Sequence, residues 1–501
     1  MPARSSRLPR PGVLLVSACC IYLSLVLVIA LNCPPDGDEA WFASPAYDLI
    51  HHGNLGTLVL DPSGYFLHSR LIGIETHTYW ALPFHFVVQA LWYKLFGFGL
   101  VQMRLISAIA GMSVLVSLFA IVVELTSDAY VAALAALLVA FDLVLTEFGG
   151  KGRMDMLCLG LGLGAQAVFL VLRRRHLSSA LFLSNLLGSW SILTHPNGII
   201  AVVGLFILIG YELRTKLRNG VGATWRPYYL VLIAIPYVLM GAGYALYIAQ
   251  DVGAFRAQIA SNSNARFYYF LHPMEGVLAE IGRYRVYYGP TEESSPFAWL
   301  KLSAVVILMG GLVGLALRGG TRLLVLLAVI PLFLLTFFNY KNPFYLIHAI
   351  PYLAACAAAF YAGWLRTGGW KKATAALAIA VVLVLGTATT LRRGATLRRR
   401  GREYAQINSI VRPLMPAQGT IMAPSFFAFW LGFDRVVEDD TMGYYTGRKW
   451  DVMIDYRPTP EETENMEKRI PQVMHHRSRL EIEEFRELFR GPSCTVYQRI
   501  R

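Results

Sequence analysis

Three carboxylates lie within four residues near the start of the chain, at Asp36, Asp38 and Glu39. An apolar stretch precedes them, so they stand where the chain would leave a bilayer, and a low dielectric there disfavours their charged form. Such a cluster suits a general base or a divalent-cation site. A solvated helix N-terminus, where acidic side chains interact favourably with the helix dipole, is the alternative interpretation.

A second acid, Asp155, ends the segment GGKGRMD between two apolar runs. The glycines, with an apolar run following the acid, are typical of a turn with an acidic residue at a helix start. Asp142 lies within the end of the preceding run, where an acid is costly in a membrane. Its position indicates either a function or a pairing with Lys151 or Arg153.

Cations and a histidine come from later segments. Lys341 lies in a short polar segment, and Arg283 and Arg285 lie in a loop that follows residue 250. A cation at a bilayer interface often only extends to lipid headgroups, but the same groups would bind a phosphate. His195 joins two apolar runs in the segment HPNG, as a tight turn or as the polar wall of a cavity.

The amino-acid composition indicates a protein whose helices lie in a membrane. The chain has 501 residues, of which 55% are hydrophobic and 15% charged, whereas soluble domains carry about 25% charged residues. The apolar residues form many runs of roughly 17–23, the length that crosses a bilayer as a helix. The net charge of +13 comes mostly from basic residues that flank these runs, and no nucleic-acid-binding module is recognisable. We therefore expect a polytopic all-α membrane protein that binds membrane lipids and no nucleic acid.

The basic residues also predict the topology. With the N-terminus in the cytoplasm, most short basic segments fall on the cytoplasmic side if 79–97 lies along the interface and does not cross. About eleven transmembrane helices result, at 13–32, 102–123, 128–147, 156–172, 178–194, 198–213, 227–249, 298–317, 322–338, 344–364 and 372–391.

Two domains are expected from this layout. Residues 1–394 form the transmembrane domain, with long outer loops at 33–101, which carries interfacial helices, and at 250–297. Residues 395–501 have ordinary charge and enough length for a core of their own. Strand-like pieces at 420–424, 436–437 and 452–454 and a polar helical stretch at 460–474 predict a small C-terminal α/β domain outside the cytoplasm.

The order of these features resembles the glycosyltransferase C superfamily. The nearest branch is the one shared by protein O-mannosyltransferases and the aminoarabinose transferases of the lipid A pathway. The similar segments are Asp38-Glu39-Ala40 with Tyr47 and Gly53-Asn54-Leu55, Tyr79-Trp80 through Gly97 with Arg104-Leu105, Phe141-Asp142 through Asp155, and Lys341 through Leu346 with Pro351.

The resemblance implies a glycosyltransferase of the cell envelope in a bacterial-type cytoplasmic membrane. A polyprenyl-phosphate-linked hexose or pentose would be attacked outside the cytoplasm by a lipid, glycan or protein hydroxyl, with inversion. Asp38 would take the acceptor proton, and Lys341 with Arg283 or Arg285 would stabilise the departing phosphate. Asp155 would orient the acceptor or share a divalent metal ion with Asp38. The expected substrate-binding residues are Glu39, Arg153, His195, Arg283, Arg285, Lys341 and Tyr345.

A transporter or flippase of lipid-linked sugars is the competing class. Such proteins usually have internal repeats, broken helices in corresponding halves and polar groups near the bilayer midplane. In this chain no repeat is visible, and the acids gather near the ends of the apolar runs. The sequence therefore favours glycosyl transfer.

Overall fold

The computed structural model of the chain describes residues 10–62, 71–218, 226–263, 268–288, 296–319, 321–439, 441–456, 476, 484–491 and 494–500. Contacts divide the chain into two compact units. Unit 1 comprises Met1–Leu31, Arg104–Gly243 and Ala265–Gly394, and unit 2 comprises Asn32–Met103, Tyr244–Asn264 and Ala395–Arg501. The expected separation of 1–394 from 395–501 stays a prediction.

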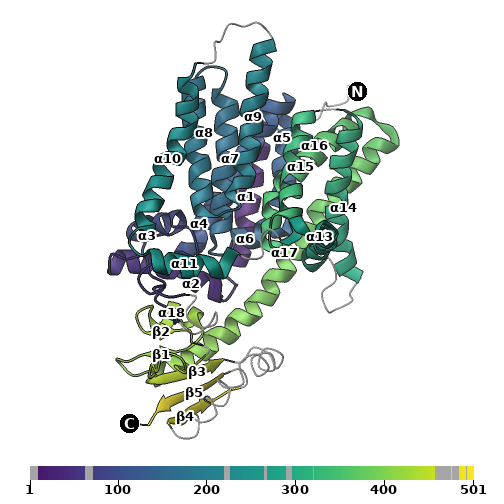
Figure 1. Cartoon of the computed structure of the whole chain (residues 1–501). Helices are drawn as coiled ribbons and strands as arrows, with labels where there is room; N and C mark the ends of the chain where they lie inside the picture. Colours follow the sequence, from purple (N-terminus) through teal and green to yellow (C-terminus); the bar gives the residue numbers. More distant parts are fainter. Residues whose placement is uncertain are drawn as a thin grey trace. The chain divides into compact units, whose positions relative to one another are not determined.

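Unit 1 is helical, and its long helices run side by side (Figure 1). It contains α1 (Pro11–Ala30), most of α4 (Leu100–Thr126), α5 (Ala129–Ala140), α6 (Leu143–Gly149), α7 (Met154–Leu172), α8 (Leu177–Thr194), α9 (Gly198–Arg218), most of α10 (Tyr228–Ile248), α12 (Tyr268–Leu271), α13 (Pro273–Tyr288), α14 (Pro296–Leu317), α15 (Arg322–Phe337), η1 (Pro343–His348), α16 (Ile350–Thr367) and the first part of α17 (Gly369–Val411).

The prediction of a multi-span helical membrane protein is confirmed. Among the described residues, eight helices are long and apolar enough to cross a membrane, and the bent pair α5–α6 makes nine. The shorter apolar helix α15 has 16 residues, and α16 falls outside this set of candidate spans. The segment 79–97 contains α3 (Phe84–Phe96), whose 13 residues reach about 20 Å, less than the roughly 30 Å of a hydrocarbon core.

Two expected spans differ from the observed helices. The segment 128–147 breaks at Phe141–Asp142, and the axes of α5 and α6 meet at 66°. The Asp142 carboxylate accepts from the backbone N–H groups of Val144 and Leu145 and so begins a new helix. The last expected span, 372–391, continues as α17 to Val411, because the arginines, alanines and leucines beyond it are strong helix formers.

Small side chains allow the helices of unit 1 to approach closely. A side chain at Gly311 of α14 would collide with Ala357 of α16, which lies in a fully buried run of small residues. Likewise, Gly386 of α17 lies against the carbonyl of Phe141, at the break between α5 and α6. Such contacts are the usual basis of helix packing in membranes, where burial of apolar surface contributes little.

Unit 2 contains helices and a small mixed sheet. Its elements are α2 (Gly37–His51), α3, the first residues of α4, the end of α10, α11 (Val252–Ser263), the second part of α17, η2 (Arg412–Leu414), β1 (Ile421–Met422), η3 (Ser425–Phe427), α18 (Ala428–Leu431), β2 (Val436–Val437), β3 (Val452–Tyr456), β4 (Phe485–Arg490) and β5 (Cys494–Arg499).

The sheet confirms the three predicted strand pieces as β1, β2 and β3. Its order is β2-β1-β3-β5-β4, with β1 parallel to both neighbours and β5 antiparallel to β3 and β4. Trp450 lies in its small core, together with side chains from β1 to β5. The expected helical stretch 460–474 lies outside the described residues.

The sheet segment contacts α2 within unit 2. The indole Nε1 of Trp41 donates to Glu438 Oε2 at 3.1 Å, and the Tyr47 hydroxyl donates to Asp434 at 2.6 Å. The Tyr47 ring also stacks on Phe433, with 5.3 Å between centroids. The chain beyond α17 therefore holds the helix whose first turn carries the first acidic cluster.

Candidate active site

Two of the three early carboxylates, Asp36 and Glu39, form a capping box at the start of α2. Asp36 accepts from the Glu39 backbone N–H at 2.9 Å, and Glu39 Oε2 accepts from the Asp36 N–H at 3.2 Å. Glu39 is fully buried. Asp38, in the first turn of the helix and half-buried, is the carboxylate outside this box. The helix-terminus interpretation therefore fits Asp36 and Glu39, and the role of Asp38 as a base stays a prediction.

The helix α3 in unit 2 carries an exposed apolar face. Leu91, Leu95 and Phe96 are 60%, 76% and 57% exposed, while Phe86 and Gln89 are buried. A helix of this kind, too short to cross, suits the boundary between headgroups and acyl chains. It supports the expectation that residues 79–97 lie along the interface.

In unit 1, Asp155 lies in the first turn of α7 and is fully buried. Its Oδ2 accepts from Arg153 Nε at 3.0 Å, and its Oδ1 has no hydrogen-bond partner in the described part of the chain. The Arg153 guanidinium also lies over the ring of Phe344, 4.3 Å from its centroid. A buried acceptor without a partner is uncommon, and it suits a ligand hydroxyl.

The turn expected at residues 195–198 is present and lies beside Asp155. His195 follows α8, and its Nδ1 accepts from the Asn197 backbone N–H at 3.1 Å. Its ring lies 5.3 Å from that of Tyr345, which η1 supplies. Asp155 interacts electrostatically with His195 and His348 as well as with Arg153. The turn interpretation of His195 is confirmed, and its place in the polar wall of a cavity stays a prediction.

The later cations form a second group in unit 1. Lys341 Nζ lies 3.2 Å from Glu280 Oε2, and Arg283 pairs with the other oxygen of the same carboxylate. The Lys341 ammonium also donates to the Leu335 and Thr336 carbonyls. Burial lowers the pKa of Lys341, although Glu280 opposes the shift. Arg285 is exposed on the same helix and takes no part in this group.

Arg283 has the most demanding environment of these cations. Its side chain is fully buried, and its Nε and Nη1 have no hydrogen-bond partner among the described residues. A buried guanidinium with unsatisfied donors is expensive unless an anion meets it. His348, which is buried too, interacts electrostatically with Arg283 as well as with Asp155 and His195. It links the two groups, which we call together the Asp155–Arg283 cluster: Arg153, Asp155, His195, Glu280, Arg283, Lys341, Tyr345 and His348.

Asp142 pairs differently from the expectation. Its Oδ2 accepts from the Tyr288 hydroxyl at 2.8 Å, and its Oδ1 caps α6. Lys151 lies 3.8 Å from Glu147 instead, and Arg153 serves Asp155. The pairing of Asp142 with Lys151 or Arg153 is therefore wrong, because the break before α6 turns this carboxylate towards α13.

Sequence reasoning missed Glu280 and His348. Glu280 lies three residues before Arg283, on the same face of α13, which is a signal that helical spacing supplies. His348 lies seven residues after Lys341, and no spacing rule singles it out. Its place follows from η1, a short helix that turns it inward among buried residues.

The described residues include no group of three or more His, Cys, Asp or Glu side chains that could hold a metal ion. Asp38 belongs to unit 2 and Asp155 to unit 1, so the metal ion expected between them stays a prediction. No step below uses a metal.

The comparisons with known proteins agree with this architecture. The family described as dolichyl-phosphate-mannose-protein mannosyltransferase (PMT_2) matches residues 77–240. No curated protein sequence matches the chain. ArnT from Cupriavidus metallidurans bound to undecaprenyl phosphate is similar in structure, with a TM-score of 0.57, 15% identity and 98% of each chain covered.

An archaeal oligosaccharyltransferase shares the fold as well. AglB from Archaeoglobus fulgidus, in complex with an inhibitory peptide and a dolichol-phosphate, matches with a TM-score of 0.51 and 12% identity, over 98% of this chain and 74% of that one. The family match covers residues 77–240 and, together with the ArnT-like fold, agrees with the resemblance stated above; the fold is that of a multi-span helical membrane protein.

Proposed function

We propose that the protein transfers a sugar from a polyprenyl-phosphate donor to an acceptor hydroxyl outside the cytoplasm, with inversion at the anomeric carbon. The observation that carries the proposal is Arg283, a fully buried guanidinium beside Lys341 whose Nε and Nη1 have no hydrogen-bond partner in the part of the chain that the structure describes. A phosphate is the anion that such a pair of cations suits. Undecaprenyl phosphate in ArnT and dolichol-phosphate in AglB support a lipid phosphate as the ligand.

The reaction is a single displacement. The acceptor oxygen attacks the anomeric carbon, and the bond from that carbon to the phosphate oxygen breaks. The electron pair stays on the phosphate, where Arg283 and Lys341 stabilise the developing charge. The acceptor proton passes to the Asp38 carboxylate, which acts as the general base. A lipid phosphate leaves readily, so the mechanism needs no strong general acid, and one displacement inverts the anomeric centre.

Asp155 has a positioning role in this scheme. Arg153 holds its Oδ2, so the carboxylate is fixed while Oδ1 accepts from a hydroxyl of the sugar or of the acceptor. His195 and Tyr345 form the neighbouring wall. The buried position of Glu39 in the capping box gives it an indirect part, which is to fix the first turn of α2 and hence Asp38.

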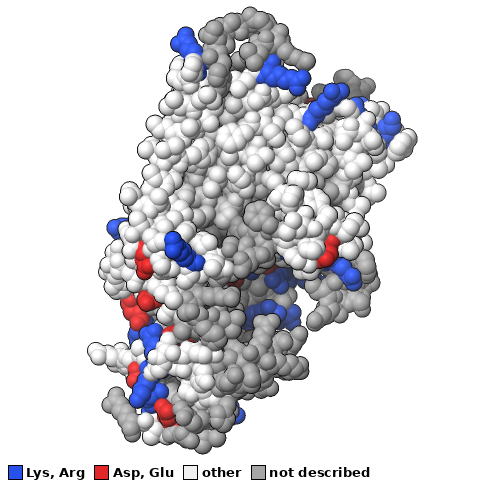
Figure 2. All heavy atoms as spheres, in the orientation of Figure 1, with Lys and Arg blue, Asp and Glu red and all other residues white. Residues whose placement is uncertain are grey.

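The distribution of charge supports an active face outside the cytoplasm. Figure 2 shows a broad band without Lys, Arg, Asp or Glu across the middle of the helical part, and Lys and Arg at one end of it. At the end of unit 1 where α7 and α16 finish, the exposed cations include Arg174, Arg175, Arg366, Lys371 and Lys372. The positive-inside rule assigns that end to the cytoplasm. Asp155 and His195 lie at the opposite ends of their helices.

Substitution of the proposed base tests the reaction. In Asp38→Asn we expect transfer from a radiolabelled polyprenyl-phosphate sugar to fall by about 10²–10⁴-fold, the contribution of a positioned base. The carboxamide keeps the size of the side chain, so donor binding should persist, and thermal unfolding of the variant checks that the fold is retained. Glu75→Gln, an exposed acid in the same loop, is the control. Normal turnover in Asp38→Asn would remove Asp38 as the base, and donor movement across vesicles without transfer would favour a flippase.

A further inference from the structure

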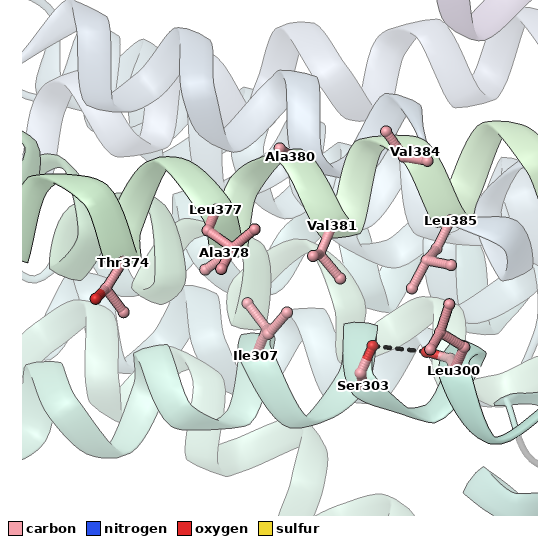
Figure 3. Close-up of a pocket in the computed structure, with 10 residues that line it drawn as sticks. All are labelled: Leu300, Ser303, Ile307, Thr374, Leu377, Ala378, Ala380, Val381, Val384 and Leu385. Carbon is pink, nitrogen blue, oxygen red and sulfur yellow. Dashed lines mark hydrogen bonds between the residues drawn. The ribbon is translucent and has the colours of Figure 1, made fainter.

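The groove between α14 and α17 has an apolar lining (Figure 3). The hydroxyls of Ser303 and Thr374, which line it, donate to carbonyls of their own helices. Buried polar atoms without a partner lie instead at the turn between α8 and α9, beside the Asp155–Arg283 cluster. Such atoms indicate a place where a ligand completes the hydrogen bonding.

Asn197 lies in this turn and is buried, with 4% of its surface exposed. Its Oδ1 accepts from Asn339 Nδ2 at 2.6 Å, and its backbone N–H donates to His195 Nδ1 at 3.1 Å. The Nδ2 of Asn197 has no hydrogen-bond partner in the described part of the chain. The side-chain amide is therefore held through its oxygen, and its N–H donors remain available to a ligand.

The turn lies against the start of α7, the helix that carries Asp155. The Cys158 thiol donates to the His195 carbonyl at 3.7 Å, and the Ser191 hydroxyl donates to the Cys158 carbonyl at 2.7 Å. Asp155 lies three residues before Cys158, on the same face of α7. This end of unit 1 thus presents an acceptor, Asp155 Oδ1, and a donor, Asn197 Nδ2, that have no partner among the described residues. A hydroxyl can satisfy both, because it donates and accepts.

Asn339 connects the turn to the segment that supplies Lys341. The two residues are two positions apart between α15 and η1, so their Cα atoms are at most about 7 Å apart. Lys341 and Arg283 are the cations assigned above to the phosphate of the donor. The sugar of such a donor is bonded directly to this phosphate. Its ring is therefore within reach of an amide that is held by Asn339.

We propose, on the basis of the function proposed above, that Asn197 binds the sugar of the lipid-linked donor. Its Nδ2 donates to a hydroxyl of the ring, and that hydroxyl or its neighbour donates to Asp155 Oδ1. Asn339 is a positioning residue, which fixes the orientation of the Asn197 amide through the bond at 2.6 Å. The ligand class is a sugar with a free hydroxyl close to the phosphate, and a site built for a hydroxyl rejects an analogue that lacks it.

Native mass spectrometry of the full chain in detergent tests the contact with the sugar. The probes are undecaprenyl phosphate and its mannosyl, glucosyl and arabinosyl derivatives, and the wild type should bind at least one derivative more tightly than undecaprenyl phosphate. In Asn197→Leu the affinity for that derivative should fall about tenfold, as for a lost hydrogen bond in a buried site. The affinity for undecaprenyl phosphate should stay within twofold. Asn185→Leu, which replaces a buried asparagine whose amide donates to the Leu181 carbonyl of its own helix, should change neither affinity by more than twofold.

Asn339→Leu tests the positioning role. It leaves the Asn197 side chain present but removes the donor that holds it, so we expect the affinity for the glycosylated lipid to fall about threefold. The double variant should lose no more than Asn197→Leu alone, because both act through one amide. The ratio of the affinities for the glycosylated and the sugar-free lipid is the readout, since misfolded protein lowers both affinities equally. If Asn197→Leu does not fold, Asn339→Leu provides the same ratio.

The two lipids distinguish a failure of this assignment from a failure of the proposed function. An unchanged ratio in Asn197→Leu, or a wild type that binds no derivative more tightly than undecaprenyl phosphate, would overturn the role of Asn197. Additive losses in the double variant would overturn the positioning role of Asn339. A wild type that does not bind undecaprenyl phosphate at all would contradict the proposed function itself.

Discussion

Arg283 offers the sharpest test of the proposed donor site, because the chain supplies a matched control two residues away. Arg283→Gln removes a buried guanidinium, and Arg285→Gln removes an exposed one from the same helix. Glu280 keeps its contact with Lys341 at 3.2 Å in both variants. A buried carboxylate without a cation would by itself destabilise the protein. The contact with Lys341 keeps Glu280 paired, so this effect does not arise in Arg283→Gln.

The magnitude follows from the two unpaired donors of Arg283. A hydrogen bond to a charged group contributes about 1.5–3 kcal/mol, so two bonds to a phosphate contribute about 3–6 kcal/mol. Each 1.36 kcal/mol is a factor of ten in rate, which gives roughly 10²–10⁴-fold. The neighbouring Glu280 reduces the effective positive charge, so we expect a loss near the lower limit, about 10²-fold in kcat/KM.

The assay is initial-rate transfer from a labelled polyprenyl-phosphate sugar, with kcat and KM determined separately. A loss in kcat shows that Arg283 acts mainly on the departing phosphate, and a rise in KM alone shows that it only binds the donor. Inhibition by polyprenyl phosphate should weaken in Arg283→Gln and remain in Arg285→Gln. If both variants lost activity equally, or if neither did, the argument from the unpaired donors would be refuted.

Three further predictions concern the framework around the site. Gly386→Leu should disrupt the contact of α17 with the Phe141 carbonyl and lower the thermal midpoint of the full chain by several degrees, as overpacking costs about 1–3 kcal/mol; an unchanged midpoint would contradict the packing argument. Trp41→Phe removes the bond to Glu438 and should cost about 1 kcal/mol, measured as faster proteolysis of the C-terminal segment. Burial raises the pKa of Asp439 above its ordinary value of 3.8, so the folded state favours the neutral acid. The stabilisation of the folded state by the neutral acid is present below about pH 4 and is lost as the pH rises through the folded pKa. Thermal unfolding of the wild type and of Asp439→Asn between pH 4 and 7 should therefore show the stability of the wild type falling relative to that of the variant.

The apolar runs and the basic residues between them were enough to predict a multi-span helical membrane protein. A run of about 20 apolar residues has few alternatives to a membrane helix, because every backbone polar group must be satisfied within the segment. The same reasoning does not locate breaks. The bend at Phe141–Asp142 depends on a side chain that caps a new helix, and the extension of α17 depends on propensity beyond the apolar run.

Most members of the candidate site were predictable from the sequence, but the pairs that they form were predictable only in part. Asp155 and Lys341 were found from their types and from their places between apolar runs. Glu280 and His348 were not, because their importance comes from the groups that α13 and η1 bring to them. Spacing within one helix can suggest a pair such as Glu280 and Arg283, but a pair from two helices has no signature in a single sequence.

The sequence by itself determined the membrane architecture, the three β-strands recognised beyond the last helix and the positions of the first acidic cluster and of Asp155, since these follow from local hydrophobicity and residue type. Tertiary structure alone decided which charges meet. It committed Asp36 and Glu39 to a cap, turned Asp142 towards Tyr288, and buried Arg283 while leaving Arg285 exposed. The physical reason is that the environment of a charge depends on neighbours distant in the chain, and those neighbours are fixed only when the helices pack.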